Sequence, residues 1–157
     1  MLDNYYPSLE KVKQLAQKGN LIPIYRTIRA DLETPVSAYL KVARPPYSFL
    51  LESVEGGERV GRFSFIGTEP YRVCSTGPGT ALGSIDPLLP VEQELNKYTV
   101  VPVEGLPPLD GGAIGYLSYD VVHYFEPRVP KPEPNPVGVP ESVFMFIDSI
   151  LIFDHLQ

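Results

Sequence analysis

The residues best suited to chemistry lie in one short segment, 49–53, which reads FLLES. Alternate side chains of an extended backbone share a face. One face then carries Phe49, Leu51 and Ser53, and the other carries Leu50 and Glu52. This set suits a free amino acid, because its ammonium group binds carboxylates, its carboxylate binds hydroxyl or N–H donors, and its side chain packs on an apolar wall. The same pattern also fits an ordinary strand end with a solvated glutamate and a serine bonded to the backbone.

Other catalytic patterns are not met. The glycines at 77, 79 and 83 have the wrong spacing for a dinucleotide-binding fingerprint, and no P-loop lysine follows a glycine cluster. Ser64 does not lie in a Gly-x-Ser-x-Gly elbow, so nothing supports a serine nucleophile. Three carboxylates, Glu52, Glu55 and Glu58, flank a Gly-Gly turn, where solvated charges are the ordinary expectation. General acid–base catalysis is therefore the less favoured interpretation of this group.

Composition excludes several further classes. A single cysteine, Cys74, excludes an internal disulfide, and two distant histidines, His123 and His155, do not form a clustered zinc site with it. The net charge is −6, from 19 acidic and 13 scattered basic residues, which disfavours nucleic acid as a partner. No apolar run is long enough to span a membrane, and the N-terminus lacks the layout of a signal peptide. These features predict a cytoplasmic protein.

The elements that must position the FLLES segment follow from periodicity and capping. Ser8 begins a short amphipathic helix that stops before Gly19, and Thr34-Pro35 begins a second helix that Arg44-Pro45-Pro46 ends. Residues 47–54 and 62–67 predict an antiparallel hairpin with a turn at 55–58. We also expect an edge strand at most over 21–28, strands near 71–75 and 113–118, a short helix within 90–98, and one bulged or two strands over 143–153.

Two more segments have a distinctive composition. Residues 110–125 begin with three glycines in five residues, which favours close packing of backbones. Residues 127–140 contain six prolines in 14 residues, which predicts a semi-rigid spacer over the surface. The chain ends at Gln157, directly after its most hydrophobic stretch. Because strands of that kind need neighbours on both sides, we expect the natural gene to continue.

The order and wording of several segments together resemble the N-terminal region of anthranilate synthase component I, in the chorismate-utilising enzyme family. These segments are TPVSAYL at 34–40, FLLES at 49–53, GRFSFIG at 61–67, GGAIGYLSYD at 111–120 and FDH at 153–155. The resemblance covers nearly the whole chain. The wider group includes aminodeoxychorismate synthase component I, with isochorismate and salicylate synthases as more distant relatives.

This resemblance implies an α+β fold in which antiparallel β-sheets pack face to face with helices outside, with residues 1–157 forming a partial domain. It also implies that the chorismate site, its Mg²⁺-binding carboxylates and its acid–base residues belong to a C-terminal portion absent from this chain. We therefore expect no catalytic residue, metal ligand or cofactor in the chain itself, and Mg²⁺ only in the full-length enzyme.

The resemblance further implies that this region binds L-tryptophan between the sheets and mediates feedback inhibition. Ser53 and Glu52 match the family's Leu-Leu-Glu-Ser motif, so Ser53 would hydrogen-bond the amino acid group and Glu52 would set the local polarity. The return strand would contribute Phe63 as apolar wall, with Arg62 and Gly61 beside it. An exposed arginine on a strand is also commonly just solvated.

On this interpretation, tryptophan stabilises a domain arrangement unfavourable to chorismate, and chorismate weakens tryptophan binding by the same factor. The implied partners are a glutaminase subunit and the C-terminal catalytic portion. Two alternatives stay open: the equivalent fragment of aminodeoxychorismate synthase component I, of folate synthesis, and a stand-alone ligand-binding or scaffold protein. The LLES wording favours anthranilate synthase, which forms anthranilate and pyruvate from chorismate and glutamine-derived ammonia.

Overall fold

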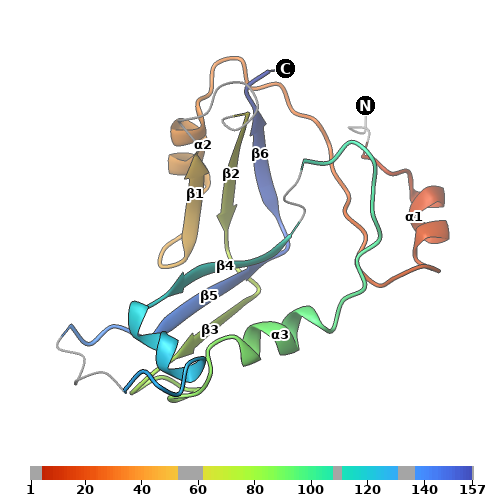
Figure 1. Ribbon diagram of the computed structural model, residues 1–157. Coiled ribbons are helices and arrows are strands. Elements are labelled where there is room, and N and C mark those ends of the chain that lie inside the picture. Colours follow the sequence, from red (N-terminus) through yellow and green to blue (C-terminus); the bar gives the residue numbers. More distant parts are fainter. Residues whose placement is uncertain (1–4, 53–61, 108–110, 131–136, 157) are drawn as a thin grey trace.

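The computed structural model describes residues 5–52, 62–107, 111–130 and 137–156. Helices and strands alternate irregularly along the chain (Figure 1). In chain order the elements are α1 (Leu9–Leu15), α2 (Pro35–Val42), β1 (Ser48–Glu52), β2 (Phe63–Thr68), β3 (Arg72–Thr76), α3 (Leu89–Leu95), β4 (Gly112–Leu117), the 3-10 helix η2 (Tyr119–Tyr124), β5 (Ser142–Ile147) and β6 (Ile150–Asp154). Because the helices accompany two antiparallel sheets, the predicted α+β class is confirmed.

The first two helices begin where local signals predict. The Ser8 hydroxyl accepts a hydrogen bond from the Lys11 amide at 3.3 Å and caps α1. At α2, Thr34 Oγ1 accepts from the Ser37 amide at 3.1 Å, while Ser37 Oγ accepts from the Thr34 amide at 2.9 Å. This reciprocal capping box, followed by a proline in the first turn, satisfies amide groups that a helix start otherwise leaves free.

The strands form two three-stranded antiparallel sheets with orders β1-β2-β6 and β3-β5-β4. The β1–β2 ladder runs from Ser48 opposite Thr68 to Glu52 opposite Ser64, so the predicted antiparallel pairing is confirmed, while the predicted turn at 55–58 lies outside the described residues. The segment 143–153 breaks at Asp148-Ser149 into β5 and β6, as its sequence indicated.

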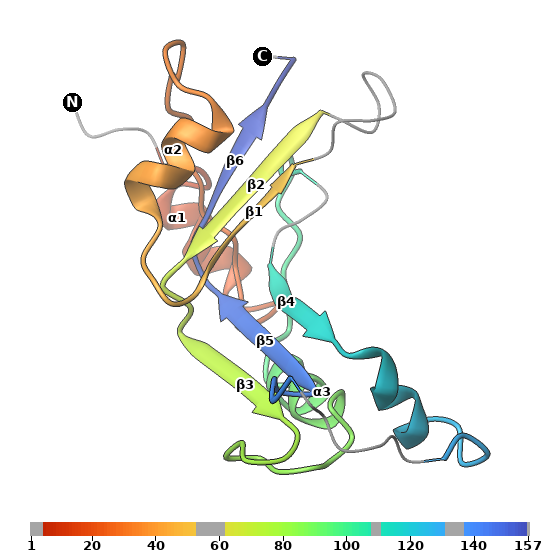
Figure 2. The ribbon, with the colours of Figure 1, turned by 90° about the vertical axis from the view of Figure 1, so that its left-hand side faces the viewer.

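The chain passes directly from one sheet to the other at two places. β2 continues into β3 through residues 69–71, and β5 continues into β6 through residues 148–149. In both views the second sheet lies beyond the end of the first, below it, rather than stacked against its face (Figures 1 and 2). The end of β1 and the start of β2 therefore lie at the end of the first sheet that is farther from the second sheet.

Each sheet has a helix on one face. On the first sheet, the Tyr39 hydroxyl of α2 lies 2.8 Å from Ser48 Oγ, and the Arg44 amide donates to Thr68 Oγ1 at 3.0 Å. Ile66, on that face, is buried. On the second sheet, Arg72 of β3 forms an ion pair with Glu94 of α3. α2 thus covers one face of the first sheet, and an ion pair joins α3 to β3 of the second sheet.

Two sequence expectations meet the structure differently. Over 21–28 no strand forms: Leu21 makes one isolated bridge to Val100 and Tyr25 another to Tyr6. Pro23 lacks an amide donor, which explains why pairing does not extend between these bridges. Close packing at the glycines is found at Gly115, where a Cβ would lie 1.8 Å from the Val143 carbonyl oxygen.

Candidate functional site

The predicted ligand residues that the structure describes lie at the end of the first sheet that is farther from the second sheet. β1 ends at Glu52 and β2 begins at Phe63, with Arg62 directly before it. Ser53 and Gly61 lie outside the described residues. Glu52 is exposed, and its register partner across the ladder is Ser64. The structure therefore brings its three described candidates to one end of the sheet.

Arg62 is held in place rather than merely solvated. Its Nε donates to Asp154 Oδ1 at 2.9 Å and its Nη2 to Oδ2 at 2.6 Å, in a two-point contact with β6. The guanidinium also lies over the Phe63 ring, 4.8 Å from its centroid. The hydrogen bonds from Arg62 lower the pKa of Asp154, and the same contact raises the pKa of Arg62. The pair therefore stays ionised at neutral pH.

Sequence reasoning missed Asp154 as a member of this site. The FDH segment at 153–155 contributes to the family resemblance, which assigns no role to its residues. No local pattern links position 62 to position 154, because their contact depends on how β6 pairs with β2: Phe63 lies opposite Asp154 in that ladder. The adjacency of Phe63 and Asp154 across the strands explains why Arg62 reaches the carboxylate.

Ser64 forms a second contact between the same two segments. Its side chain is fully buried, and its Oγ lies 2.8 Å from His155 Nε2. The His155 amide also donates to the Arg62 carbonyl at 2.9 Å. The serine and histidine do not make a catalytic pair, since a substrate cannot reach a hydroxyl with no exposed surface, and the neighbouring Asp154 carboxylate is bound to Arg62. Their contact is structural, between β2 and the end of β6.

One face at this end of the sheet is apolar. Leu51, Phe65 and Ile152 lie side by side across the three strands, and the Phe63 and Phe65 rings are 6.2 Å apart. Leu51 is 44% exposed and Phe65 and Ile152 are half-buried, so the row is accessible at the Leu51 side. Glu52 points to the opposite face, because successive residues of a strand alternate. A ligand that touches both the carboxylate and the apolar row must therefore lie across the strand ends.

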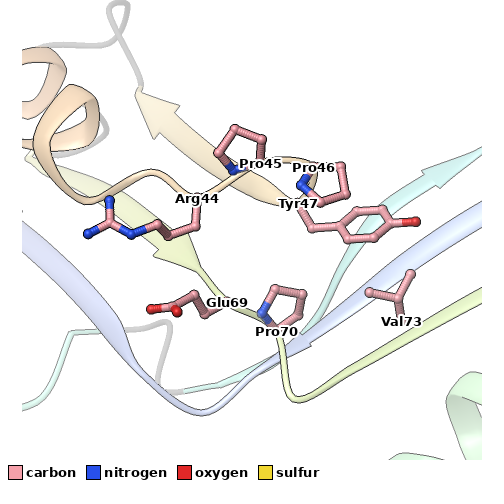
Figure 3. A pocket seen from close by; sticks show the side chains of 7 residues that line it. All are labelled: Arg44, Pro45, Pro46, Tyr47, Glu69, Pro70 and Val73. Carbon is pink, nitrogen blue, oxygen red and sulfur yellow. The ribbon is translucent and has the colours of Figure 1, made fainter.

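A separate pocket of about 250 Å³ lies at the joint between the sheets (Figure 3). Its walls come from Arg44, Pro45, Pro46, Tyr47, Glu69, Pro70 and Val73. Arg44 Nη1 donates to the carbonyls of Ala43, at 3.1 Å, and Lys41, at 3.4 Å, so its guanidinium caps the end of α2. None of the predicted ligand residues lines this pocket, and it is open to solvent. We assign no ligand to it.

No group of three or more acidic, histidine or cysteine side chains within the described ranges is arranged to hold a metal ion. The buried carboxylate of Glu94 is instead an ion-pair partner of Lys97 and Arg72. The described residues thus offer no donor set that fits Mg²⁺. Nor does any helix in the described part of the chain have the length and apolar character needed to cross a membrane.

Comparisons with known proteins give a consistent family of relatives. No protein-family model matches the chain. It is 48% identical over 153 residues to "Probable anthranilate synthase component 1" of Schizosaccharomyces pombe, covering 96% of this chain and 30% of that protein. It is 41% identical over 162 residues to "Anthranilate synthase component 1" of a Synechocystis species, covering 96% and 32%. The chain thus spans about a third of the length of these curated relatives.

A solved structure is also similar, with 26% sequence identity and a TM-score of 0.46. It is a crystal structure of anthranilate synthase component I from Streptococcus pneumoniae, and the match covers 84% of this chain and 29% of that one.

Proposed function

Since this chain is homologous to the N-terminal region of anthranilate synthase component I, we propose that it is the tryptophan-binding, feedback-regulatory region of such an enzyme. The whole enzyme would form anthranilate and pyruvate from chorismate and glutamine-derived ammonia, in the cytoplasm, for tryptophan biosynthesis. Chorismate, Mg²⁺ and the acid–base chemistry would belong to a catalytic portion outside residues 1–157, and a glutaminase subunit would supply ammonia. The chain would not catalyse alone.

The observation that carries this proposal is the 48% identity over nearly the whole chain to a protein of that name. The geometry at the end of the first sheet supports it. An exposed carboxylate, Glu52, and an accessible apolar row that includes Leu51 and Phe65 lie near one another. A zwitterionic amino acid with a large apolar side chain needs these two surfaces.

In the proposed binding mode, Glu52 sets the negative potential that receives the ligand's ammonium group. Ser53, the next residue, hydrogen-bonds the amino acid group. The apolar row and the Phe63 ring receive the indole. Tryptophan bound here would favour an arrangement of the enzyme that disfavours chorismate, and chorismate would weaken tryptophan binding by the same factor.

Calorimetric titration of the intact enzyme with L-tryptophan tests the proposal. Ser53→Ala removes a hydrogen bond to a charged group, which is worth about 1.5–3 kcal/mol and corresponds to roughly 10- to 100-fold weaker binding. Glu52→Gln should weaken binding in the same direction. The matched controls Ser149→Ala and Glu104→Gln, at exposed positions, should leave the affinity unchanged. Wild-type affinity in the Ser53→Ala enzyme would contradict the assignment.

Product analysis of the intact enzyme, with chorismate and glutamine as substrates, tests the activity. Anthranilate and pyruvate are expected. Formation of aminodeoxychorismate would instead indicate the folate-pathway relative considered above. Inhibition of anthranilate formation by L-tryptophan, but not by D-tryptophan at the same concentration, is the expected signature of regulation.

A further inference from the structure

We propose that Asp154 and His155, which together form the β6 clamp, are positioning residues of the tryptophan site. The two residues hold the first part of β2 from both faces of the sheet, and so fix the strand end that presents the ligand-binding groups. This inference rests on the proposed function, because it assigns a role to residues behind that site.

Asp154 acts on one face. It receives two hydrogen bonds from Arg62, at 2.9 and 2.6 Å, and the guanidinium so held covers the Phe63 ring. Two-point contacts between guanidinium and carboxylate are stronger and more directional than single hydrogen bonds. The positive charge of Arg62 is therefore matched within the protein. Its role is to orient the Phe63 ring, which lines the site, rather than to bind the ligand's carboxylate directly.

His155 acts on the other face. His155 directly follows β6, and its ring reaches Ser64, whose side chain alternates with that of Phe63 in β2 and so lies on the opposite face. Its Nε2 lies 2.8 Å from the buried Ser64 Oγ, and its amide donates to the Arg62 carbonyl at 2.9 Å. Ser64 is the register partner of Glu52. By fixing Ser64, His155 also fixes the position of β1 at Glu52, whose carboxylate binds the ligand in the proposed mode.

Both clamp residues act at the start of β2: Asp154 holds Arg62, directly before the strand, and His155 holds Ser64, its second residue. Without the clamp, the first residues of β2 would keep only their backbone ladders to β6 and β1, and Phe63 would lose the cation that covers it. Loss of the clamp should therefore loosen the binding site before it unfolds the sheet.

The test uses the intact enzyme and measures L-tryptophan affinity together with thermal stability. Asp154→Asn and His155→Ala should each weaken tryptophan binding about 10-fold. Asp148→Asn, an exposed carboxylate change in the β5–β6 connection, is the matched control and should leave affinity unchanged. Two rescues separate positioning from general damage. His155→Gln keeps a hydrogen-bonding group and should retain more affinity than His155→Ala, and the exchange Arg62→Asp with Asp154→Arg should regain affinity lost in either single variant.

Unchanged affinity in both Asp154→Asn and His155→Ala, with Ser53→Ala still impaired, would overturn the clamp and leave the proposed function standing. An exchange variant that regains the parent melting temperature but not the tryptophan affinity would also overturn the clamp. This comparison stays valid where a single variant folds poorly, because it depends only on the exchange variant and the parent. Absence of tryptophan binding in the parent enzyme would overturn both proposals.

Discussion

The Phe49 ring fills the space where Gly67 has no side chain. These two residues are direct partners in the β1–β2 ladder, and a Cβ on Gly67 would lie 2.2 Å from Phe49 Cε1. Phe49 is 8% exposed, so the ring has little room to move away. An aromatic ring that covers a glycine on the neighbouring strand restores the apolar contact that the glycine lacks.

Gly67→Ala should therefore destabilise the protein by about 1–3 kcal/mol, the usual effect of overpacking. Urea unfolding measures the loss. In a Phe49→Leu background the same substitution should cost clearly less, because the shorter side chain leaves space for the new methyl group. Equal costs in the two backgrounds would show that the ring is not the obstacle.

Gly115→Ala should be more damaging than Gly67→Ala. The added Cβ would lie 1.8 Å from the Val143 carbonyl oxygen and 2.8 Å from Phe144 Cα, both backbone atoms of β5. A side-chain ring can rotate, whereas a paired strand moves only by breaking its ladder. We expect a loss of about 3 kcal/mol or more, or failure to fold. A smaller loss than that of Gly67→Ala in the same unfolding assay would contradict the packing of β4 on β5.

Thr76 and Ser142 form a buried hydroxyl pair, with Oγ1 and Oγ 2.8 Å apart. Thr76→Val leaves the Ser142 hydroxyl without its partner in a buried position and should cost about 1–3 kcal/mol. The double variant Thr76→Val with Ser142→Ala removes both hydroxyls and should cost less than the sum of the single changes. Strict additivity in this double-mutant cycle would show that the pair contributes nothing.

Glu94 should make stability depend on pH. A hydrogen bond from Lys97 and the charge of Arg72 lower its pKa, against the effect of burial. A carboxylate whose folded pKa lies below its unfolded value of about 4.3 stabilises the protein above that value and loses this contribution as the pH falls through the folded pKa. At pH 7, Glu94→Gln should therefore lower the melting temperature relative to the parent protein. Below about pH 4, the difference in melting temperature between the variant and the parent should become smaller.

The matched control for this pH effect is Glu92→Gln, which changes an exposed carboxylate on the same helix. It should reduce the melting temperature at pH 7 by less than Glu94→Gln does. If the two variants have the same pH profile, the α3 ion pairs do not carry the acid sensitivity.

Local signals account for the parts of the fold that the sequence predicts well. The caps at Ser8 and Thr34 and the hairpin of β1 and β2 depend on residues close together in the chain. The Glu52 position at a strand end follows from the same short-range alternation. What propensity alone overestimates is the segment at 21–28, where a proline leaves only two isolated bridges.

Contacts between distant segments account for what the sequence leaves open. Arg62 meets Asp154, and Ser64 meets His155, across some 90 positions, which no local periodicity reveals. An arginine on a strand is ordinarily solvated, so its two-point contact becomes visible only when the β2–β6 register is known. In the same way, Glu94 is an unremarkable helix residue until α3 packs against Arg72.

The way the strands are shared between the sheets also sets the order in which they can be completed. The first sheet takes β1 and β2 from early in the chain and β6 from its far end, whereas all strands of the second sheet lie between them in sequence. In sequence, the whole second sheet therefore lies between β2 and β6 of the first sheet. During synthesis, the β2 edge that receives β6 must wait until every strand of the second sheet has been made, and closing so large a loop is a slow step in folding.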